Sequence, residues 1–146
     1  MGEEDLRKHY HFVGIGGAGM STLAFLMLAK GQRVSGSDLK EGASITLLKE
    51  KGAWIVAGHD ERNIIGADCV IYSSAVHPEN PELKAARNQK IPVYQRAQFL
   101  AKLMENHFGI TVAGAHGKTT TTSMISQLLI RAGLNPTTAV GGSLRE

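Results

Sequence analysis

Short apolar stretches alternate with longer amphipathic ones along most of the chain. The apolar stretches have the length of strands, and the stretches between them have the spacing of helices. The predicted strands are residues 10–15, 32–37, 54–57, 68–73 and 91–94, and the predicted helices are residues 20–30, 44–51, 81–89 and 95–106. Strand–helix alternation with short connections predicts an α/β fold, a parallel sheet flanked by helices with right-handed crossovers.

The pattern begins again after His107. The elements predicted there are a strand at residues 108–113, a helix at residues 120–132 and the start of a strand at residues 137–140. They are too few to close a core of their own. We therefore expect one domain at residues 1–106, followed by the truncated start of a second α/β domain at residues 107–146. The alternative is that the tail packs against the first domain or against a second copy of the chain.

Composition narrows the class of protein. The 146 residues carry sixteen basic and thirteen acidic side chains, scattered rather than gathered in a stripe, which argues against nucleic-acid binding. The charged first ten residues lack the apolar stretch of a signal peptide, and no apolar run is long enough to span a membrane. The single cysteine, Cys69, suits a reducing cytoplasm. Cys69, Trp54 and the methionines are interpreted as core residues, and His77 and His107 as surface residues.

The first candidate site is the glycine-rich turn after the first predicted strand. Residues 14–19 read Gly-Ile-Gly-Gly-Ala-Gly and match G-x-G-x-x-G. In this pattern the first glycine makes a tight turn, the second lets backbone N–H groups approach a diphosphate, and the third lets helix and strand pack closely. The helix that follows adds free N–H groups and a positive dipole end, and Ser21 adds a hydroxyl in its first turn.

Asp38 ends the second predicted strand, about twenty residues after the glycine loop. A dinucleotide-binding fold places an acid there to bind ribose hydroxyls. These features alone make a Rossmann-like domain with NAD the first hypothesis. A turn or helix-capping aspartate is the plainer alternative for Asp38.

A second loop, residues 114–120, lies between a predicted strand and a predicted helix and contains Gly-Lys-Thr-Thr. Backbone N–H groups of such a loop surround phosphates, Lys118 reaches the terminal phosphates, and the Thr119 hydroxyl binds Mg²⁺, with Thr120 as the second choice. The full P-loop spacing is not met, because Val112 occupies the place of the first glycine. Two phosphate-binding loops on successive α/β units argue against a simple dehydrogenase.

Four ordered segments resemble the Mur ligase family, and within it the enzymes that add L-alanine. They are HFVGIGGAGMS at residues 11–21, SSAV followed by NPE at residues 73–82, IPVYQRA at residues 91–97 and GAHGKTTT at residues 114–121. The resemblance starts near His9 and covers nearly all of the chain after it. One departure is Ala115, which stands where the family usually has threonine and removes a hydroxyl from the loop.

The resemblance implies an ATP-dependent ligase of peptidoglycan synthesis in the cytoplasm. In this reaction ATP phosphorylates the lactyl carboxylate of UDP-N-acetylmuramate, and the amino group of L-alanine attacks the acyl phosphate to form an amide. Lys118 and Mg²⁺ neutralise the charge of the transferring phosphoryl group. A chain with only the start of the ATP-binding domain is expected to be inactive alone. No nucleic-acid or membrane partner is expected, and the oligomeric state stays open.

The resemblance also assigns residues to two sites. The glycine loop then holds the diphosphate of the UDP-sugar instead of NAD, and Asp38 and His59 contact the uridine. The expected UDP-sugar site is Gly14, Gly16, Gly17, Ala18, Gly19, Met20, Ser21, Asp38, His59, Ser73 and Ser74. The expected ATP site is Gly114, His116, Gly117, Lys118, Thr119 and Thr120, with Lys118 and Thr119 catalytic and Thr119 as the Mg²⁺ ligand.

Some alternatives to these assignments remain. An exposed loop histidine is the plainer interpretation of His59, and a strand-end turn is that of Ser73 and Ser74. Arg96 is interpreted as a domain-interface residue in preference to a substrate contact. For the chain as a whole, the alternatives are an NAD(P)-binding domain of a dehydrogenase and a nucleotide-sensing module without catalysis.

Overall fold

Five parallel strands form one sheet in the order β3-β2-β1-β4-β5. The computed structural model describes residues 7–105, 107–140 and 143–144. The strands of this sheet are β1 (His9–Val13), β2 (Arg33–Asp38), β3 (Trp54–Ala57), β4 (Cys69–Tyr72) and β5 (Val93–Gln95). The α/β prediction is confirmed, and the five observed strands differ from the predicted ones by two residues or fewer at each end.

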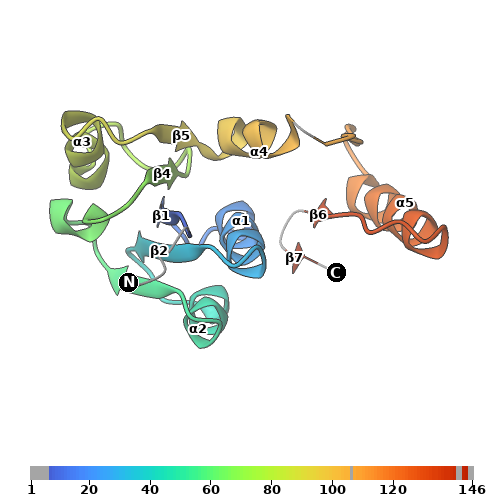
Figure 1. Ribbon diagram of the computed structural model, residues 1–146, viewed down its shortest axis with the longest axis horizontal. Coiled ribbons are helices and arrows are strands. Elements are labelled where there is room, and N and C mark those ends of the chain that lie inside the picture. Colours follow the sequence, from blue (N-terminus) through green and yellow to red (C-terminus); the bar gives the residue numbers. More distant parts are fainter. Residues whose placement is uncertain (1–6, 106, 141–142, 145–146) are drawn as a thin grey trace, which may run out of the picture.

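Helices cover both faces of the sheet (Figure 1). The helical elements are α1 (Ala18–Ala29), α2 (Ala43–Glu50), η1 (Glu61–Ile64), α3 (Pro81–Asn88) and α4 (Arg96–Met104). Helices α1, α2 and α4 pack on one face, and the short 3-10 helix η1 and α3 pack on the other. The short helix η1 was not predicted from the sequence.

Each strand sends alternate side chains to the two helical layers, because successive side chains of a strand point to opposite faces. In β1, Phe12 packs in the cluster of α1, α2 and α4, whereas Val13 packs in the cluster of η1 and α3. Both residues are fully buried. Strand β1 lies at the centre of the sheet, and all of its residues except the half-buried Tyr10 are buried, as expected for a parallel strand covered on both faces.

Glycine allows β2 to approach β1 and its following loop. A Cβ atom at Gly36 would lie 2.6 Å from Cδ1 of Ile15 and 2.7 Å from the carbonyl oxygen of Phe12. Ile15 is fully buried at this point. The base of the first glycine loop is therefore packed tightly onto β2, and only glycine fits there.

The part of the chain beyond residue 107 differs from the prediction. It contains α5 (Lys118–Arg131) and an antiparallel pair, β6 (Ala139–Val140) and β7 (Ser143–Leu144), which lies between α1 and α5 in Figure 1. The prediction of a strand at residues 108–113 is wrong. No other described strand lies beside this segment to complete its backbone hydrogen bonds. The predicted domain boundary falls at Asn106, which lies outside the described residues.

Two predictions about the core are corrected by the structure. Trp54 is 59% exposed because β3 is the edge strand of the sheet, and Met124 is 63% exposed because α5 buries none of its residues. Met20, Met27 and Cys69 are buried as predicted, and burial raises the pKa of the Cys69 thiol to about 11. His77 and His107 are exposed, as predicted.

Among the described residues, no helix is both long and apolar enough to cross a membrane.

Candidate functional site

The residues predicted to bind the UDP-sugar gather at the carboxyl edge of the sheet. The glycine loop follows β1, Asp38 ends β2, His59 follows β3, and Ser73 follows β4. The chain passes from β1 to β2 and β3 on one side and returns to β4 on the other side of β1. Ligands of open α/β sheets bind at this kind of switch point, outside the carboxyl ends of the strands.

The first glycine loop is fixed to the end of β2. The N–H groups of Gly14 and Ile15 donate to the carbonyl oxygen of Ser37 at 2.8 and 3.1 Å, and Gly14 has a φ of 77° that suits glycine. The N–H of Gly16 donates to Oδ2 of Asp38 at 2.8 Å. A Cβ atom at Gly16 would lie 2.9 Å from that same oxygen, so the glycine makes room for this carboxylate.

Asp38 is therefore a structural part of the loop as well as a predicted ribose contact. Its second oxygen, Oδ1, accepts from the N–H of Lys40 at 3.0 Å. Each carboxylate oxygen can accept more than one hydrogen bond, so both retain capacity for a ligand hydroxyl. The two observed bonds hold the carboxylate beside the loop before any ligand arrives.

The first turn of α1 presents two backbone donors. The N–H groups of Ala18 and Gly19 have no hydrogen-bond partner among the described residues, as expected for the start of a helix. The N–H groups of Met20 and Ser21 donate to the carbonyl oxygen of Gly17. The Ser21 hydroxyl is buried and donates to the carbonyl oxygen of Ala18 at 3.1 Å. The N–H groups of Ala18 and Gly19 are therefore free to bind an anion, whereas those of Met20 and Ser21 are already engaged in the helix.

Arg96 lies against this turn. A Cβ atom at Gly19 would lie 3.0 Å from both Cδ and Nη1 of Arg96, so the third glycine of the motif makes room for an arginine rather than for a strand. Arg96 is exposed and forms no hydrogen bond with the described residues. Its guanidinium therefore adds positive charge and free donors beside the N-terminus of α1, where an anion is already favoured.

His59 is held by a turn at the end of β3. The N–H of Gly58 donates to the carbonyl oxygen of Asp38 at 2.8 Å, which ties this turn to β2. Asp60 then caps η1 by accepting from the N–H of Arg62, and it also pairs with the Arg62 side chain. These bonds lower the pKa of Asp60 to about 2. His59 lies between Gly58 and Asp60, both of which these bonds fix in place, and its side chain is 17% exposed.

A buried carboxylate, Glu82 of α3, lies behind His59. Its Oε2 accepts from the Ser37 hydroxyl at 2.7 Å and lies 2.9 Å from Nδ1 of His59. Its Oε1 accepts from the Asn63 amide at 2.6 Å and lies 3.4 Å from Nε2 of His11. Burial raises the pKa of Glu82, but the donors around it outweigh burial and leave the pKa below its usual value.

The polar network continues along β1 and β2 away from the site. Nδ1 of His9 donates to the carbonyl oxygen of Gly66 at 2.9 Å, and burial lowers the pKa of His9, so the neutral ring accepts at Nε2 from the Ser35 hydroxyl at 2.6 Å. Ser35 then accepts from Nδ1 of His11 at 2.8 Å, whereas Nε2 of His11 lies 3.4 Å from Oε1 of Glu82 and is buried without a hydrogen bond. A row of polar groups thus runs through the layer between the sheet and α3.

Ser73 and Ser74 complete the predicted UDP-sugar residues. The N–H of Ser73 donates to the carbonyl oxygen of Val13, which ties the end of β4 to β1, and its hydroxyl accepts from the N–H of Ala75. A Cβ atom at Gly14 would lie 3.3 Å from Cβ of Ser73, so the serine lies directly beside the glycine loop. Ser74 is exposed and has no partner among the described residues.

The second loop leads into α5, two residues earlier than predicted. Gly117 is its N-cap with a φ of 79°, and the N–H groups of Lys118, Thr119 and Thr120 have no partner among the described residues. Nζ of Lys118 donates to the carbonyl oxygens of Gly114 at 2.6 Å and of Ala115 at 3.2 Å. The free N–H groups, the helix dipole and the lysine together suit a phosphate.

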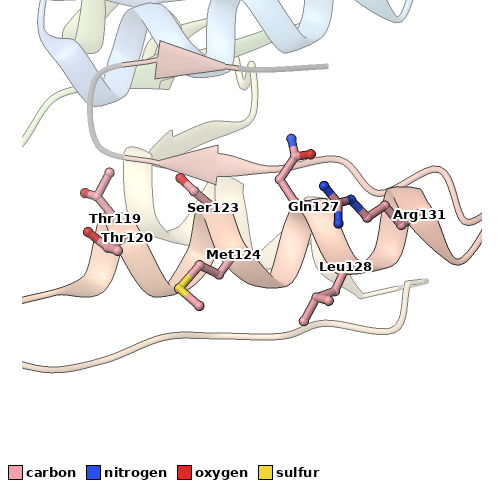
Figure 2. A pocket seen from close by; sticks show the side chains of 7 residues that line it. All are labelled: Thr119, Thr120, Ser123, Met124, Gln127, Leu128 and Arg131. Atoms are coloured by element: carbon pink, nitrogen blue, oxygen red, sulfur yellow. The ribbon is translucent and has the colours of Figure 1, made fainter.

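A shallow groove runs along one face of α5 (Figure 2). It begins at the hydroxyl groups of the first turn and continues over apolar and polar side chains to the end of the helix. Its lining residues are Thr119, Thr120, Ser123, Met124, Gln127, Leu128 and Arg131. No group of three or more metal-binding side chains is found in the described parts of the chain.

Sequence reasoning missed Glu82 and His11 as functional candidates, and it interpreted Arg96 as a domain-interface residue. Polar residues at alternate positions of otherwise apolar strands were a usable signal for the network: His11 of β1 is registered with Ser35 of β2. Glu82 belongs to the NPE segment, but a glutamate in the first turn of a helix is ordinarily exposed. Nothing in the sequence indicates that Arg96 lies beside Gly19.

Comparisons with known proteins agree with this arrangement. Residues 9–108 match the family described as Mur ligase family, catalytic domain. The UDP-N-acetylmuramate–L-alanine ligase of Aquifex aeolicus is 52% identical over 138 residues, which are 94% of this chain and 30% of that protein. The chain thus spans about 30% of the length of the curated relatives it matches.

Two solved structures share the fold. The UDP-N-acetylmuramate-alanine ligase of Thermotoga maritima superposes with a TM-score of 0.82 at 35% identity, over 91% of this chain and 31% of that one. The UDP-N-acetylmuramate:L-alanyl-gamma-D-glutamyl-meso-diaminopimelate ligase of Neisseria meningitides gives 0.83 at 33% identity, over 94% of this chain and 44% of that one. With its glycine loop at the carboxyl edge of a five-stranded parallel sheet, this chain belongs to the Mur ligase family.

Proposed function

We propose that this chain supplies the UDP-sugar site and the ATP phosphate loop of the ligase that joins L-alanine to UDP-N-acetylmuramate. The reaction proceeds through an acyl phosphate made from ATP. The observation that carries the proposal is the site at the carboxyl edge of the sheet, where free N–H groups of α1 lie beside Arg96 and Asp38. The names of the most similar relatives support L-alanine as the amino acid.

In the proposed UDP-sugar site, the diphosphate lies at the N-terminus of α1. The N–H groups of Ala18 and Gly19 and the guanidinium of Arg96 donate to its oxygens. Asp38 accepts from ribose hydroxyls, and His59 contacts the uracil base. The hydroxyls of Ser73 and Ser74 add donors from the end of β4.

In the proposed ATP site, the phosphates lie at the N-terminus of α5. The N–H groups of Lys118, Thr119 and Thr120 bind phosphate oxygens, and the Lys118 ammonium neutralises their charge. The Thr119 hydroxyl would hold Mg²⁺, which supplies further positive charge to the transferring phosphoryl group. Residues 1–106 are proposed as the UDP-sugar domain and residues 107–146 as part of the ATP domain, and the cytoplasm stays the predicted location.

The 146-residue chain is expected to bind without catalysing the reaction. Every residue of the second loop is exposed, so this chain provides no closed environment in which a phosphoryl group could be transferred away from water. Incubation with UDP-N-acetylmuramate, L-alanine and ATP should give no amide above background. Product formation by the purified chain would contradict this expectation.

Calorimetric titration with UDP-N-acetylmuramate, with NAD as the control ligand, tests the proposed UDP-sugar site. We expect heat of binding from the UDP-sugar and none from NAD, and we expect Asp38→Ala to weaken UDP-sugar binding by more than about tenfold. Binding of NAD in place of the UDP-sugar would instead support a dehydrogenase domain.

A further inference from the structure

Glu82 and His59 form a pair at the boundary between the core and the proposed UDP-sugar site. The carboxylate is fully buried, whereas the imidazole is 17% exposed and follows the carboxyl end of β3. Oε2 of Glu82 and Nδ1 of His59 are 2.9 Å apart. One ring nitrogen of His59, Nδ1, therefore faces the core, and the other, Nε2, has no hydrogen-bond partner among the described residues.

The hydrogen bonds around Glu82 fix which ring nitrogen of His59 carries the proton. A carboxylate can only accept, and the donors around Glu82 favour its charged form. Oε2 already accepts from the Ser37 hydroxyl, and Nδ1 of His59 must donate to the same oxygen. The neutral ring then has its proton on Nδ1 and a lone pair on Nε2.

We propose that Glu82 is a positioning residue that holds His59 in the Nδ1–H tautomer, so that Nε2 accepts a hydrogen bond from N3–H of uracil and selects uracil over cytosine. This inference rests on the proposed function, because it assumes that a uridine nucleotide binds at the carboxyl edge of the sheet. The two bases differ at the relevant atom: N3 of uracil carries a hydrogen, whereas N3 of cytosine is an acceptor. An unprotonated Nε2 therefore accepts a hydrogen bond from N3–H of uracil. With cytosine, the lone pair of Nε2 would face the lone pair of N3, and no hydrogen bond could form.

The substitution Glu82→Gln changes the donor pattern with little change in shape. If the new amide oxygen keeps the hydrogen bond from Asn63, the new NH₂ group faces Ser37 and Nδ1 of His59. Nδ1 must then accept, and the proton of the neutral ring moves to Nε2. The variant should therefore present a donor to the base where the wild-type chain presents an acceptor.

The matched control is Glu79→Gln. Glu79 lies three positions before Glu82 in the sequence, is exposed and pairs with Lys84 on the surface at 2.6 Å. The control makes the same chemical change without touching His59. It should leave both the ring of His59 and nucleotide binding as they are in the wild-type chain.

The experiment combines nitrogen NMR of the histidine rings with calorimetric titration of UDP and CDP at neutral pH. We expect the Nδ1–H form of His59 in the wild-type chain and in Glu79→Gln, with UDP bound roughly tenfold or more tightly than CDP, because an unmatched polar group costs about that factor. In Glu82→Gln we expect the Nε2–H form and a UDP-to-CDP ratio lower by roughly the same factor.

Three results would overturn the inference. The first is a proton on Nε2 of His59 in the wild-type chain, which can be observed even if Glu82→Gln does not fold. The second is equal binding of UDP and CDP with UDP-N-acetylmuramate still bound, which would leave the proposed function standing. The third is no binding of the UDP-sugar at all, which would overturn the proposed function together with the inference.

Discussion

Two glycine loops each open a helix in this chain, but only the first is built into a sheet. Residues 14–19 are fixed by hydrogen bonds that their N–H groups donate to Ser37 and Asp38, and they lie beside Arg96. Residues 114–120 are all exposed, and the bonds of Lys118 there are to carbonyl oxygens of its own loop. The same local pattern thus occurs in two settings. The first loop is surrounded by residues from distant strands, whereas the second is in contact mainly with its own residues and helix.

This difference separates what a motif supplies from what a fold supplies. Both motifs provide free N–H groups at a helix N-terminus, and both therefore suit phosphates. Only the first also has a carboxylate, a histidine and an arginine brought beside it by other elements of the fold. Selectivity for one nucleotide is therefore expected at the first loop more than at the second.

The largest expected effect comes from the packing beneath the first loop. Gly36→Ala places a Cβ atom 2.6 Å from Ile15 and 2.7 Å from the backbone of Phe12, so the free energy of unfolding should fall by about 3 kcal/mol. Gly42→Ala is the control, because it meets nothing within 4 Å and its backbone is extended. Urea unfolding measures both, and equal stability of the two variants would show that the loop does not depend on this packing.

A crossed pair of substitutions tests the separation of the two loops. Asp38→Ala removes the carboxylate that accepts from Gly16, and UDP-sugar binding should weaken by more than tenfold with ATP binding unchanged. Lys118→Ala should weaken ATP binding and leave UDP-sugar binding unchanged, because the hydrogen bonds of Lys118 among the described residues are to its own loop. Titration of both variants with both ligands measures this, and a loss of both ligands in either variant would mean that the sites are coupled.

A smaller effect is expected for the arginine beside Gly19. Arg96→Gln removes a charge from the start of α1, so UDP should bind roughly tenfold more weakly while uridine, which has no diphosphate, binds nearly as before. Arg33→Gln is the control, since Arg33 is exposed at the opposite end of the sheet. Equal losses for UDP and uridine would place Arg96 away from the diphosphate.

The smallest effect is expected at the second loop. Ala115→Thr restores the hydroxyl that the family usually has, at an exposed position. The free energy of unfolding should change by no more than about 0.5 kcal/mol, and ATP binding should strengthen slightly or stay the same. Thermal unfolding and ATP titration check this, and a clear loss of stability would mean that the loop is packed more tightly than its exposure indicates.

The sequence predicted the sheet well because short, largely apolar stretches alternate with helical ones. The strands at residues 54–57 and 68–73 needed only that pattern. The strand predicted at residues 108–113 has the same composition but no neighbouring strand in the described structure, and a strand exists only with a partner. Local pattern alone does not reveal whether that partner is present.

The candidate site was predicted where it depends on strand ends and missed where it depends on side chains from a distance. Asp38 and His59 follow strands, so their place at the carboxyl edge could be inferred from the order of the elements. Glu82 reaches the same region from the first turn of α3, and Arg96 reaches it from α4. Those two positions depend on how helices pack, which the spacing of residues does not specify.

The convergence of strand ends at one edge has a consequence for how folding and ligand binding are linked. Asp38, His59 and Arg96 come together only when β2, β3 and β5 are all in register with the centre of the sheet. A partly unfolded chain therefore has no partial site, and a ligand that binds the native chain alone stabilises all five strands at once. At a concentration of 100 times its dissociation constant, such a ligand adds about 2.7 kcal/mol to the free energy of unfolding. A nucleotide that binds as proposed would therefore stabilise the whole sheet reversibly and in a concentration-dependent way, and its depletion should lower the stability of the whole domain.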